Sequence, residues 1–369
     1  MNPPRRIGLE EAAALLAEAG RVLLFLHISP DGDTIGSSLA LCHALRHLGK
    51  EAWCVGVDPV PRIFRFLPGW DSLFVPWAEV QGEWDLGVFL DCGDRHRVGA
   101  AEPLLGRCRV TLNIDHHASN SLFGDYNWID YQAAAVGEMT YRLIRALGVS
   151  LDPGMATCLY TSLVTDTGSF RYESTTPETH RIAAELIAAG VRPYQVTEAI
   201  FENETVARLR LLSLCLGTLR LHAGGRIATL QVPLTMLAEA GAEPEDVDGL
   251  VNYARSVQGV EVGMLFREVE PGRVRVNLRS RGLVDVSEVA RRFGGGGHPR
   301  AAGCTLAGTL AEAEAAVVAA AAACLAPEGL GGGPDLAPPG APGPHPPGAQ
   351  GPARPAGAGD REPPGEGAG

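Results

Sequence analysis

The stretch VTLNIDHH, residues 110–117, joins an apolar strand pattern to three side chains that can bind a metal ion. The β-branched and apolar residues 110–114 predict a buried strand, so Asp115, His116 and His117 should emerge where that strand ends. Successive side chains of an extended backbone alternate in direction. The two histidines therefore cannot point the same way. One can bind a metal ion while the other faces a substrate or a supporting side chain.

The composition is that of an ordinary globular protein. The 369 residues predict two domains, and 46% hydrophobic and 20% charged residues are typical values. We find no leader pattern and no run near the ~20 apolar residues of a membrane span. The eight cysteines are scattered, so we expect a cytoplasmic, reduced protein with no membrane partner. A net charge of −12 argues against a stable complex with long nucleic acid.

Strand and helix patterns alternate over the first part of the chain, which predicts an α/β fold with a mostly parallel sheet. Expected strands cover residues 22–27, 52–57, 86–90 and 110–114. Expected helices cover 35–48, 133–147, 153–164, 177–189, 193–201 and 205–216. A smaller α/β domain should follow, with strands at 219–222, 226–232, 260–268 and 273–280 and helices at 245–256, 286–293 and 310–325.

These patterns set the expected domain boundaries. We assign 1–192 to a catalytic metal-binding domain, 193–216 to linker helices, 217–326 to a substrate-binding domain and 327–369 to a disordered tail. The tail is dominated by Gly, Pro and Ala, which bury too little apolar surface to offset the entropy of ordering. The active site is expected in a cleft between the two folded domains.

Further metal-capable side chains accompany the opening stretch at the ends of other elements. The predicted ligands are His27, Asp31, Asp33, Asp91, His116 and Asp166. Oxygen and nitrogen donors without thiolate suit Mn²⁺, with Mg²⁺ or Co²⁺ as substitutes. Two metal ions that share a carboxylate would relieve the repulsion among so many acids, and they would activate a bridging hydroxide for attack on phosphorus. Taken alone, the turn at 31–34 also fits an ordinary helix cap at Asp33 or Thr34.

Two other clusters carry weaker signals. The run Gly294–Gly297 before His298 can bring backbone amides close to an anion, although a flexible turn is the better interpretation of this run taken alone. The pair His43 and His47 has a metal-capable spacing, but a solvated helix face is the better interpretation. Asn120 and Ser37 fit either a supporting role at the site or polar capping.

Taken in order, these motifs closely resemble the DHH phosphoesterase family, and within it the nano-RNase A group of oligoribonucleases and phosphatases. The resemblance covers about residues 7–326, and it rests on the following residues: His27, Asp31, Asp33, Asp91, Asp115-His116-His117, Asp166 and the run 294–303. That last run, GGGGHPRAAG, is similar to the hallmark of the DHH-associated C-terminal domain.

The resemblance implies a role for each matching residue. His27, Asp31 and Asp91 would bind one Mn²⁺ and Asp33, Asp91, His116 and Asp166 the other. Asp115 would orient His116, while His117 would face the scissile phosphate, so that His117, Asp115 and Asp91 form the catalytic group. Substrate contacts are expected from Arg279, Ser280, Gly296, Gly297, His298 and Arg300.

The activity that the resemblance implies is Mn-dependent hydrolysis of short oligoribonucleotides, linear dinucleotides and 3′-phosphoadenosine 5′-phosphate. A cyclic-di-AMP phosphodiesterase, a RecJ-like single-strand DNA exonuclease and a family II pyrophosphatase are alternatives with the same metal site. A nucleotide-binding regulator without turnover is the alternative outside enzymes. The sequence leaves open whether the chain forms a homodimer.

Overall fold

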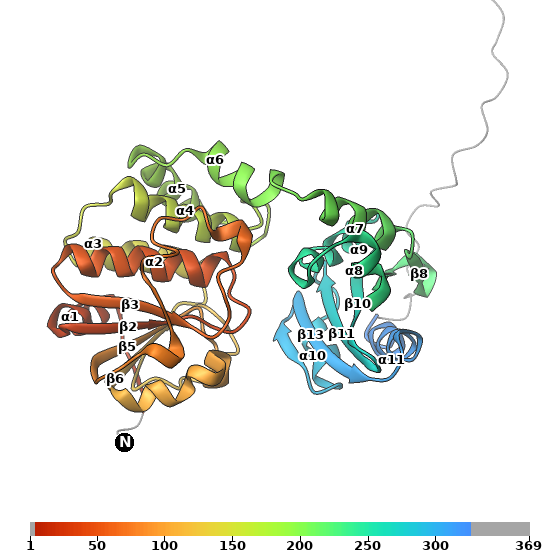
Figure 1. Ribbon diagram of the computed structural model, residues 1–369, viewed down its shortest axis with the longest axis horizontal. Coiled ribbons are helices and arrows are strands. Elements are labelled where there is room, and N and C mark those ends of the chain that lie inside the picture. The colour runs from red at the N-terminus through yellow and green to blue at the C-terminus, as the bar shows by residue number, and fades with distance from the viewer. Residues whose placement is uncertain (1–3, 326–369) are drawn as a thin grey trace, which may run out of the picture. The chain divides into compact units, whose positions relative to one another are not determined.

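This computed structural model describes residues 4–325. Within them, the first part of the chain contains a parallel sheet of seven strands. Across the sheet the strands are β1 (Arg5–Arg6), β7 (Tyr126–Ile129), β6 (Cys108–Asp115), β5 (Trp84–Leu90), β2 (Arg21–Phe25), β3 (Glu51–Gly56) and β4 (Phe74–Pro76) (Figure 1). Every neighbouring pair is parallel. The carboxyl ends of the strands therefore meet at one edge, where open α/β sheets bind their ligands.

Both faces of this sheet are apolar. Its central strands carry apolar residues at consecutive positions, and successive side chains of a strand point to opposite faces. The covering segments are α2 (Gly32–His47), α3 (Val136–Ala146), α4 (Pro153–Asp166) and the 3-10 segment η3 (Arg95–Arg107). Val22 and Leu24 of β2 belong to a core that includes the buried residues of α2, α3 and α4. Leu23 and Phe25 point the other way, into a core with η3. Figure 1 shows α2 across one face and the orange segment of η3 on the other.

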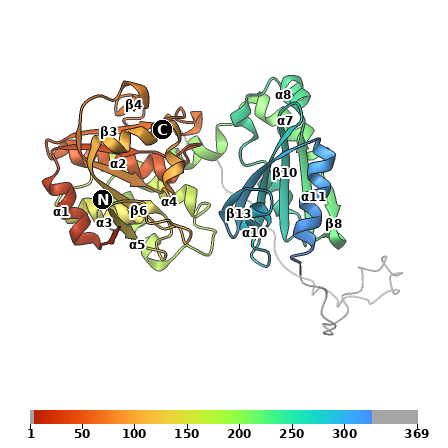
Figure 2. The same ribbon diagram turned by 90° about the horizontal axis from the view of Figure 1, so that it is seen from below.

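The second half of the chain forms a smaller sheet of six strands in the described residues. Their order is β12 (Gly296–His298), β13 (Ala301–Ala307), β11 (Arg273–Ser280), β10 (Val262–Glu270), β9 (Ile227–Val232) and β8 (Arg220–His222). Its pairs are antiparallel except β9 with β10. One face packs on α10 (Val286–Arg291) and α11 (Leu310–Ala322), and α11 runs beside β10 in Figure 2. The other face packs on α7 (Val206–Leu216), α8 (Leu234–Ala240) and α9 (Val251–Ser256).

The predicted fold class is confirmed, with local differences. Remaining helical segments are α1 (Leu9–Glu18), α5 (Pro177–Ala188), α6 (Pro193–Thr197), η1 (Arg62–Phe64), η2 (Trp77–Glu79), η4 (Glu198–Glu202), η5 (Ala223–Gly225) and η6 (Pro244–Val247). The single helix expected at 245–256 is two segments, η6 and α9, because Asp248 is extended and Gly249 has φ 83°. The helix expected at 193–201 continues from α6 into a π-helical turn, η4. The sequence patterns did not predict α1 and α8, nor the strands β1, β4, β7, β12 and β13.

The expected disordered tail, 327–369, lies outside the described residues. The proposed domain boundaries remain predictions. Among residues 4–325, no helix combines the length and apolar composition that crossing a bilayer requires.

Helices α2 and α4 approach closely at Gly36. A Cβ atom at this position would overlap the carbonyl oxygen of Cys158 and would lie 3.2 Å from the amide nitrogen of Ser162. Glycine lets the two helix backbones meet, and this contact brings Asp33 of α2 close to the C-terminal half of α4.

We expect Gly36→Ala to lower the free energy of unfolding by about 1–3 kcal/mol, the usual cost of overpacking a core. Urea denaturation would measure the loss. Gly106→Ala is the matched control, because Gly106 is exposed and no atom lies within 4 Å of the added Cβ. Equal stability of the two variants would contradict the close packing of α2 on α4.

Candidate metal centre

The predicted ligands meet at the carboxyl edge of the parallel sheet. His27 follows β2, Asp91 follows β5, and His116 follows β6; these three strands are neighbours in the sheet. Asp31 is the N-cap of α2, where its carboxylate accepts hydrogen bonds from the amides of residues 33 and 34. Asp166 is the last residue of α4. Residues from five separate elements thus converge on one region.

One group of ligand atoms lies around His27. Its Nε2 atom is 3.7 Å from Oδ1 of Asp31 and 3.4 Å from Oδ2 of Asp91. The Nδ1 atom of the ring contacts the carbonyl oxygen of Ile28 at 2.9 Å, so Nδ1 is a donor and Nε2 is the ring atom that faces the carboxylates. The ligand atoms of His27, Asp31 and Asp91 all lie within 4.8 Å of one another.

A second group lies around His116. Its Nε2 atom is 3.5 Å from Oδ2 of Asp166 and 3.6 Å from Oδ1 of Asp91. His116, Asp33 and Asp166 have ligand atoms within 4.8 Å of one another, as do His116, Asp91 and His117. Asp91 therefore borders both groups. The six predicted ligands thus lie in groups that share Asp91 or His116, and His117 joins one of these groups; their roles as ligands remain predictions.

Asp33 joins three helices through its buried carboxylate. Oδ2 accepts a hydrogen bond from the amide of Val136 at 2.7 Å, and Oδ1 accepts one from the amide of Gly137 at 3.1 Å. These are the first amides of α3, so the carboxylate also lies at the positive end of that helix. Oδ1 further accepts hydrogen bonds from the hydroxyls of Ser37 on α2 and Ser162 on α4.

The expected contact between Asp115 and His116 is corrected by the structure. Oδ1 of Asp115 accepts a hydrogen bond from Nδ1 of His117 at 2.6 Å. His116 is instead held by the carbonyl oxygen of Ala133, which lies 2.9 Å from its Nδ1 atom. Strand β6 ends at Asp115, and beyond it both histidine rings reach Oδ1 of Asp91, His116 at 3.6 Å and His117 at 3.3 Å. Asp115 also accepts a hydrogen bond from Nδ2 of Asn120 at 2.5 Å.

Crowded carboxylates give this region a strong attraction for cations. Burial and the charge of Asp91 raise the pKa of Asp33 to about 7. Burial and the charge of Asp33 raise the pKa of Asp166 well above its usual range. Burial alone would lower the pKa values of His27 and His116, but the surrounding carboxylates outweigh it and raise both to about 10. Protonated imidazoles and neutral acids reduce this repulsion in the absence of a metal ion.

Two buried atoms mark where a cation fits. Nε2 of His27 and Oδ1 of Asp91 have no hydrogen-bond partner in the described residues. Buried polar atoms are nearly always satisfied, and both of these atoms face the other ligand groups. Nitrogen and carboxylate donors are suitable ligands for a divalent cation. The residues present therefore fit a bound metal ion.

Residues of the second sheet reach the same region. The ring of His298 stacks on the ring of His117 with a centroid distance of 4.0 Å. Burial and the neighbouring charges of His117 and His116 lower the pKa of His298 to about 4, which makes it a neutral imidazole. Arg300 forms an ion pair with Glu173, on the loop after α4, at 2.6 Å.

Other predicted substrate contacts have positions but no tested role. Arg279 is half-buried, and its Nη1 atom donates to the carbonyl oxygen of Leu278. The hydroxyl of Ser280 is buried and bonded to Glu261 and to the amide of residue 282, so it supports the loop that follows β11. Gly296 and Gly297 form β12 and pair with residues 303 and 302. The glycine run is thus part of a sheet rather than a flexible turn, and their role as substrate contacts remains a prediction.

Ser162 and Ala133 are supporting residues that the sequence analysis missed. Ser162 lies four residues before Asp166 on α4, a spacing that places both on one helix face and could have identified it. Ala133 acts only through its carbonyl oxygen, for which no sequence signal exists. Asn120 and Ser37, for which the sequence left two roles open, both donate to site carboxylates.

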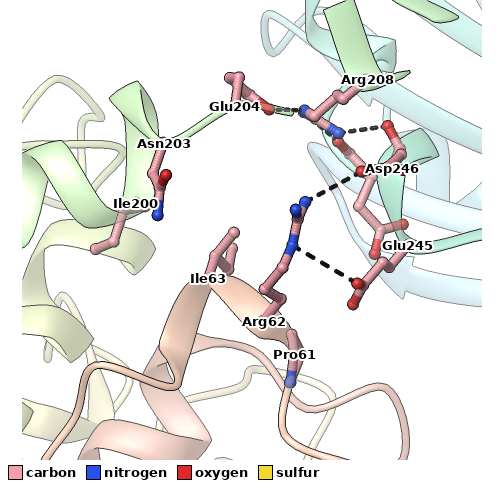
Figure 3. Close-up of a pocket in the computed structure, with 10 residues that line it drawn as sticks. Pro61, Arg62, Ile63, Ile200, Asn203, Glu204, Arg208, Glu245 and Asp246 are labelled. Carbon is pink, nitrogen blue, oxygen red and sulfur yellow. Dashed lines mark hydrogen bonds and ion pairs between the residues drawn. The ribbon is translucent and has the colours of Figure 1, made fainter. Parts of the chain in front are cut away.

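A separate pocket lies away from these residues (Figure 3). Arg62 of η1 contacts Asp246 at 3.2 Å and Glu245 at 3.8 Å, while Arg208 pairs with Glu204 and with the backbone of η6. No predicted site residue lines this pocket. Both arginines that line it are paired with acidic residues of the same lining, so the pocket is an ion-paired junction rather than the candidate site.

The pKa of Asp166 is raised and that of Asp115 is lowered. Replacing each residue by asparagine should therefore change the free energy of unfolding in opposite directions. In metal-free protein at pH 8, Asp166→Asn should raise the free energy of unfolding, because a carboxylate with a raised folded-state pKa loses stability as pH rises through that pKa. Asp115→Asn should lower it by about 2 kcal/mol. The pKa of Asp115 is lowered to about 2: the His117 hydrogen bond outweighs burial. Its contribution is present above the unfolded pKa and is lost only as pH falls toward 2.

Urea unfolding in the presence of a chelator would measure both variants. Among residues 4–325 the Asp166 carboxylate has an ion pair with His116 but no hydrogen-bond donor, so Asp166→Asn changes charge without breaking a hydrogen bond. A shift of the same sign in both variants would contradict the electrostatic account.

The comparisons with known proteins agree with this geometry. Residues 21–163 match the DHH family, N-terminal domain, and residues 224–327 match the DHHA1 domain. A bifunctional oligoribonuclease and PAP phosphatase, NrnA, from Thermus thermophilus is 41% identical over 297 residues, which cover 80% of this chain and 87% of that protein. The protein of the same name from Bacillus subtilis is 28% identical and covers 77% of this chain and 89% of its own length.

A solved structure has the same fold. The crystal structure of an exopolyphosphatase-related protein from Bacteroides fragilis aligns with a TM-score of 0.80 and 25% identity, over 85% of this chain and 94% of that one. With the residues at the sheet edge and both family matches in place, the chain belongs to the DHH phosphoesterases, with a DHH domain followed by a DHHA1 domain, and is a phosphodiesterase or phosphatase hydrolase.

Proposed function

We propose that this enzyme hydrolyses short oligoribonucleotides, linear dinucleotides and 3′-phosphoadenosine 5′-phosphate with two bound Mn²⁺ ions. The observation that carries the proposal is the pair of ligand groups that share Asp91, one around His27 and one around His116. The names of the similar proteins from Thermus thermophilus and Bacillus subtilis support the substrate class. Mg²⁺ and Co²⁺ prefer similar donors and are substitutes to be compared.

Metal ions at these groups would supply a nucleophile from water near neutral pH and would offset charge that develops on the phosphoryl oxygens. Asp91, anchored at the end of β5, would help to hold metal at both groups. Carbonyl oxygens orient the imidazoles of His27 and His116 through their Nδ1 atoms. Such outer contacts commonly hold a ligating ring in one tautomer and one direction.

His117 would act on the substrate. Asp115 accepts a hydrogen bond from Nδ1, so Nε2 is the atom left for a phosphoryl or leaving oxygen. The carboxylates of Asp115 and Asp91 raise the pKa of His117 although burial opposes this shift. A protonated Nε2 atom can donate to an oxygen as negative charge builds on it. This assigns His117 to substrate contact and proton donation, with Asp115 as the residue that positions it.

The second sheet would hold a further phosphate or the nucleoside. His298 is neutral, so it would act as a hydrogen-bond partner rather than as a cation. Arg279 and Arg300 carry the positive charge of this side. The ion pair of Arg300 with Glu173 is solvent-accessible, and exposed pairs of this kind are weak, so a substrate phosphate can replace the carboxylate.

The net charge and the cysteines support a substrate size and a cellular compartment for the enzyme. The net charge of −12 favours small substrates that are held locally over long nucleic acid. The eight cysteines, all within the described residues, are free thiols, which fits a reducing cytoplasm. A homodimer is compatible with this proposal and is not required by it.

With Mn²⁺, the purified protein should release nucleoside monophosphates from 5′-phosphorylated dinucleotides and inorganic phosphate from 3′-phosphoadenosine 5′-phosphate. A chelator should remove both activities and added Mn²⁺ should restore them. Asp166→Ala should lower turnover by about 1,000-fold, equal to about 4 kcal/mol of barrier. Chromatography of the products and a phosphate-release assay would measure these rates.

His47→Ala is the control variant, because His47 is exposed on α2 outside the ligand groups. Cyclic-di-AMP and long single-stranded DNA complete the substrate panel. Faster cleavage of either would replace the proposed substrate class by the corresponding alternative. Binding of a bisphosphate nucleotide without any turnover would favour the regulator.

A further inference from the structure

Tyr172 is an exposed aromatic residue beside the metal-ligand groups that has no part in the proposed chemistry. The residue is 39% exposed. A Cβ atom on Gly168 would overlap the ring atoms of Tyr172, so the hydroxyl end of the ring rests against the backbone two residues after Asp166. The amide of Tyr172 donates to the carbonyl oxygen of Thr167 at 3.0 Å, which fixes the loop. The ring is therefore held rigidly and still open to a ligand.

Arg255 approaches this ring from the second sheet. Its guanidinium carbon lies 5.6 Å from the centroid of the Tyr172 ring. The backbone of Arg255 on α9 is pressed against Gly263 of β10, where a Cβ atom would overlap it. Among the described residues, no carboxylate forms an ion pair with this guanidinium. Ring and guanidinium thus form an isolated pair of flat groups on firmly placed backbones.

The pair lies between the two places where phosphates are expected. Gly168 connects Tyr172 to Asp166 and the metal-ligand groups. Glu173, the neighbour of Tyr172, binds Arg300. A nucleotide could place one phosphate at the metal ligands and another near the arginines of the second sheet. Its base would then lie between these two phosphates, beside Tyr172 and Arg255. Nucleobases stack on aromatic rings and on guanidinium planes with little preference for sequence.

We propose that Tyr172 and Arg255 form a nucleobase-binding pair, in which the base stacks on the phenol ring and takes the guanidinium of Arg255 as its second neighbour. The inference rests on the proposed hydrolysis of short nucleotides and adds a specificity-determining element to it. A base between two planes needs about 7 Å, twice the ~3.4 Å stacking repeat of nucleic acids. Arg255, at 5.6 Å from the ring centroid, would move outward by about 1 Å when the base enters.

Substrates that differ only in a base test the proposal. The full-length enzyme with Mn²⁺ would be assayed on a 5′-phosphorylated dinucleotide and on its two isomers in which one ribose carries hydrogen in place of the base. Tyr172→Ala should raise the KM for the intact dinucleotide by about 10- to 100-fold with a much smaller change in kcat. On the isomer that lacks the stacked base, the variant and the wild type should have the same KM.

Three further variants separate stacking from other roles. Tyr172→Phe keeps the ring and should retain most of the affinity, whereas Arg255→Ala should raise KM in the same base-dependent manner as Tyr172→Ala. Tyr194→Ala is the matched control, because Tyr194 is an exposed tyrosine of α6, and it should leave every KM unchanged. Turnover of the base-free isomer reports that each variant is folded.

Two outcomes would overturn the inference. An equal loss on the intact and base-free substrates would assign Tyr172 a purely structural role, and an unchanged KM in Tyr172→Ala would exclude stacking. Failure of the wild type to cleave any dinucleotide is a different result, since it would reject the proposed function itself.

Discussion

The carboxylate of Asp33 is the group on which the arrangement of this site depends. It is buried, it accepts hydrogen bonds from the first amides of α3, and it accepts the hydroxyls of Ser37 on α2 and Ser162 on α4. The same carboxylate lies with His116 and Asp166 in one ligand group. The same carboxylate therefore holds three helices together and takes its place among the predicted metal ligands. Because α4 also ends at Asp166, any shift of these helices moves two ligands at once.

Electrostatic repulsion is the cost of this arrangement. Burial and neighbouring acids raise the pKa values of Asp33 and Asp166, and the carboxylates in turn raise those of His27 and His116. The helices, the glycine contact at position 36 and the carbonyl partners of the imidazoles hold these groups together against that repulsion. A bound divalent cation reverses the sign of the interaction, so metal binding should contribute to stability by the same contacts that serve catalysis.

The fold and the ligand groups were predictable where simple periodicity applies. Parallel strands end at one edge of a sheet, so Asp91 and the residues after β6 had to lie close together. The alternation of side chains also predicted that His116 and His117 diverge, but both rings reach Oδ1 of Asp91, because β6 ends at Asp115 and the histidines lie beyond the regular strand. The partner of Asp115 is His117 rather than His116, which the family resemblance implies. The contacts of Ala133 and Arg255 could not be predicted from the sequence. Ala133 contacts His116 through its backbone carbonyl oxygen, which every residue type has. Arg255 meets Tyr172 across segments that are far apart in the chain, and no periodic pattern reports such a contact.

The loop after α4 shows why specificity is harder to predict than chemistry. Gly168, Ser169 and Phe170 all have positive φ, near 56°, 62° and 61°, a conformation that costs a non-glycine residue about 1–2 kcal/mol. The amide of Ser169 bonds to Val164 at 2.7 Å and that of Phe170 to the Thr167 hydroxyl at 2.9 Å, which offsets the strain. The resulting turn carries the chain sharply away from Asp166 and directs residues 172 and 173 toward arginines of the second sheet. Strain retained beside a ligand commonly marks a functional constraint. Here that constraint fixes how Tyr172 and Glu173 are placed relative to Asp166.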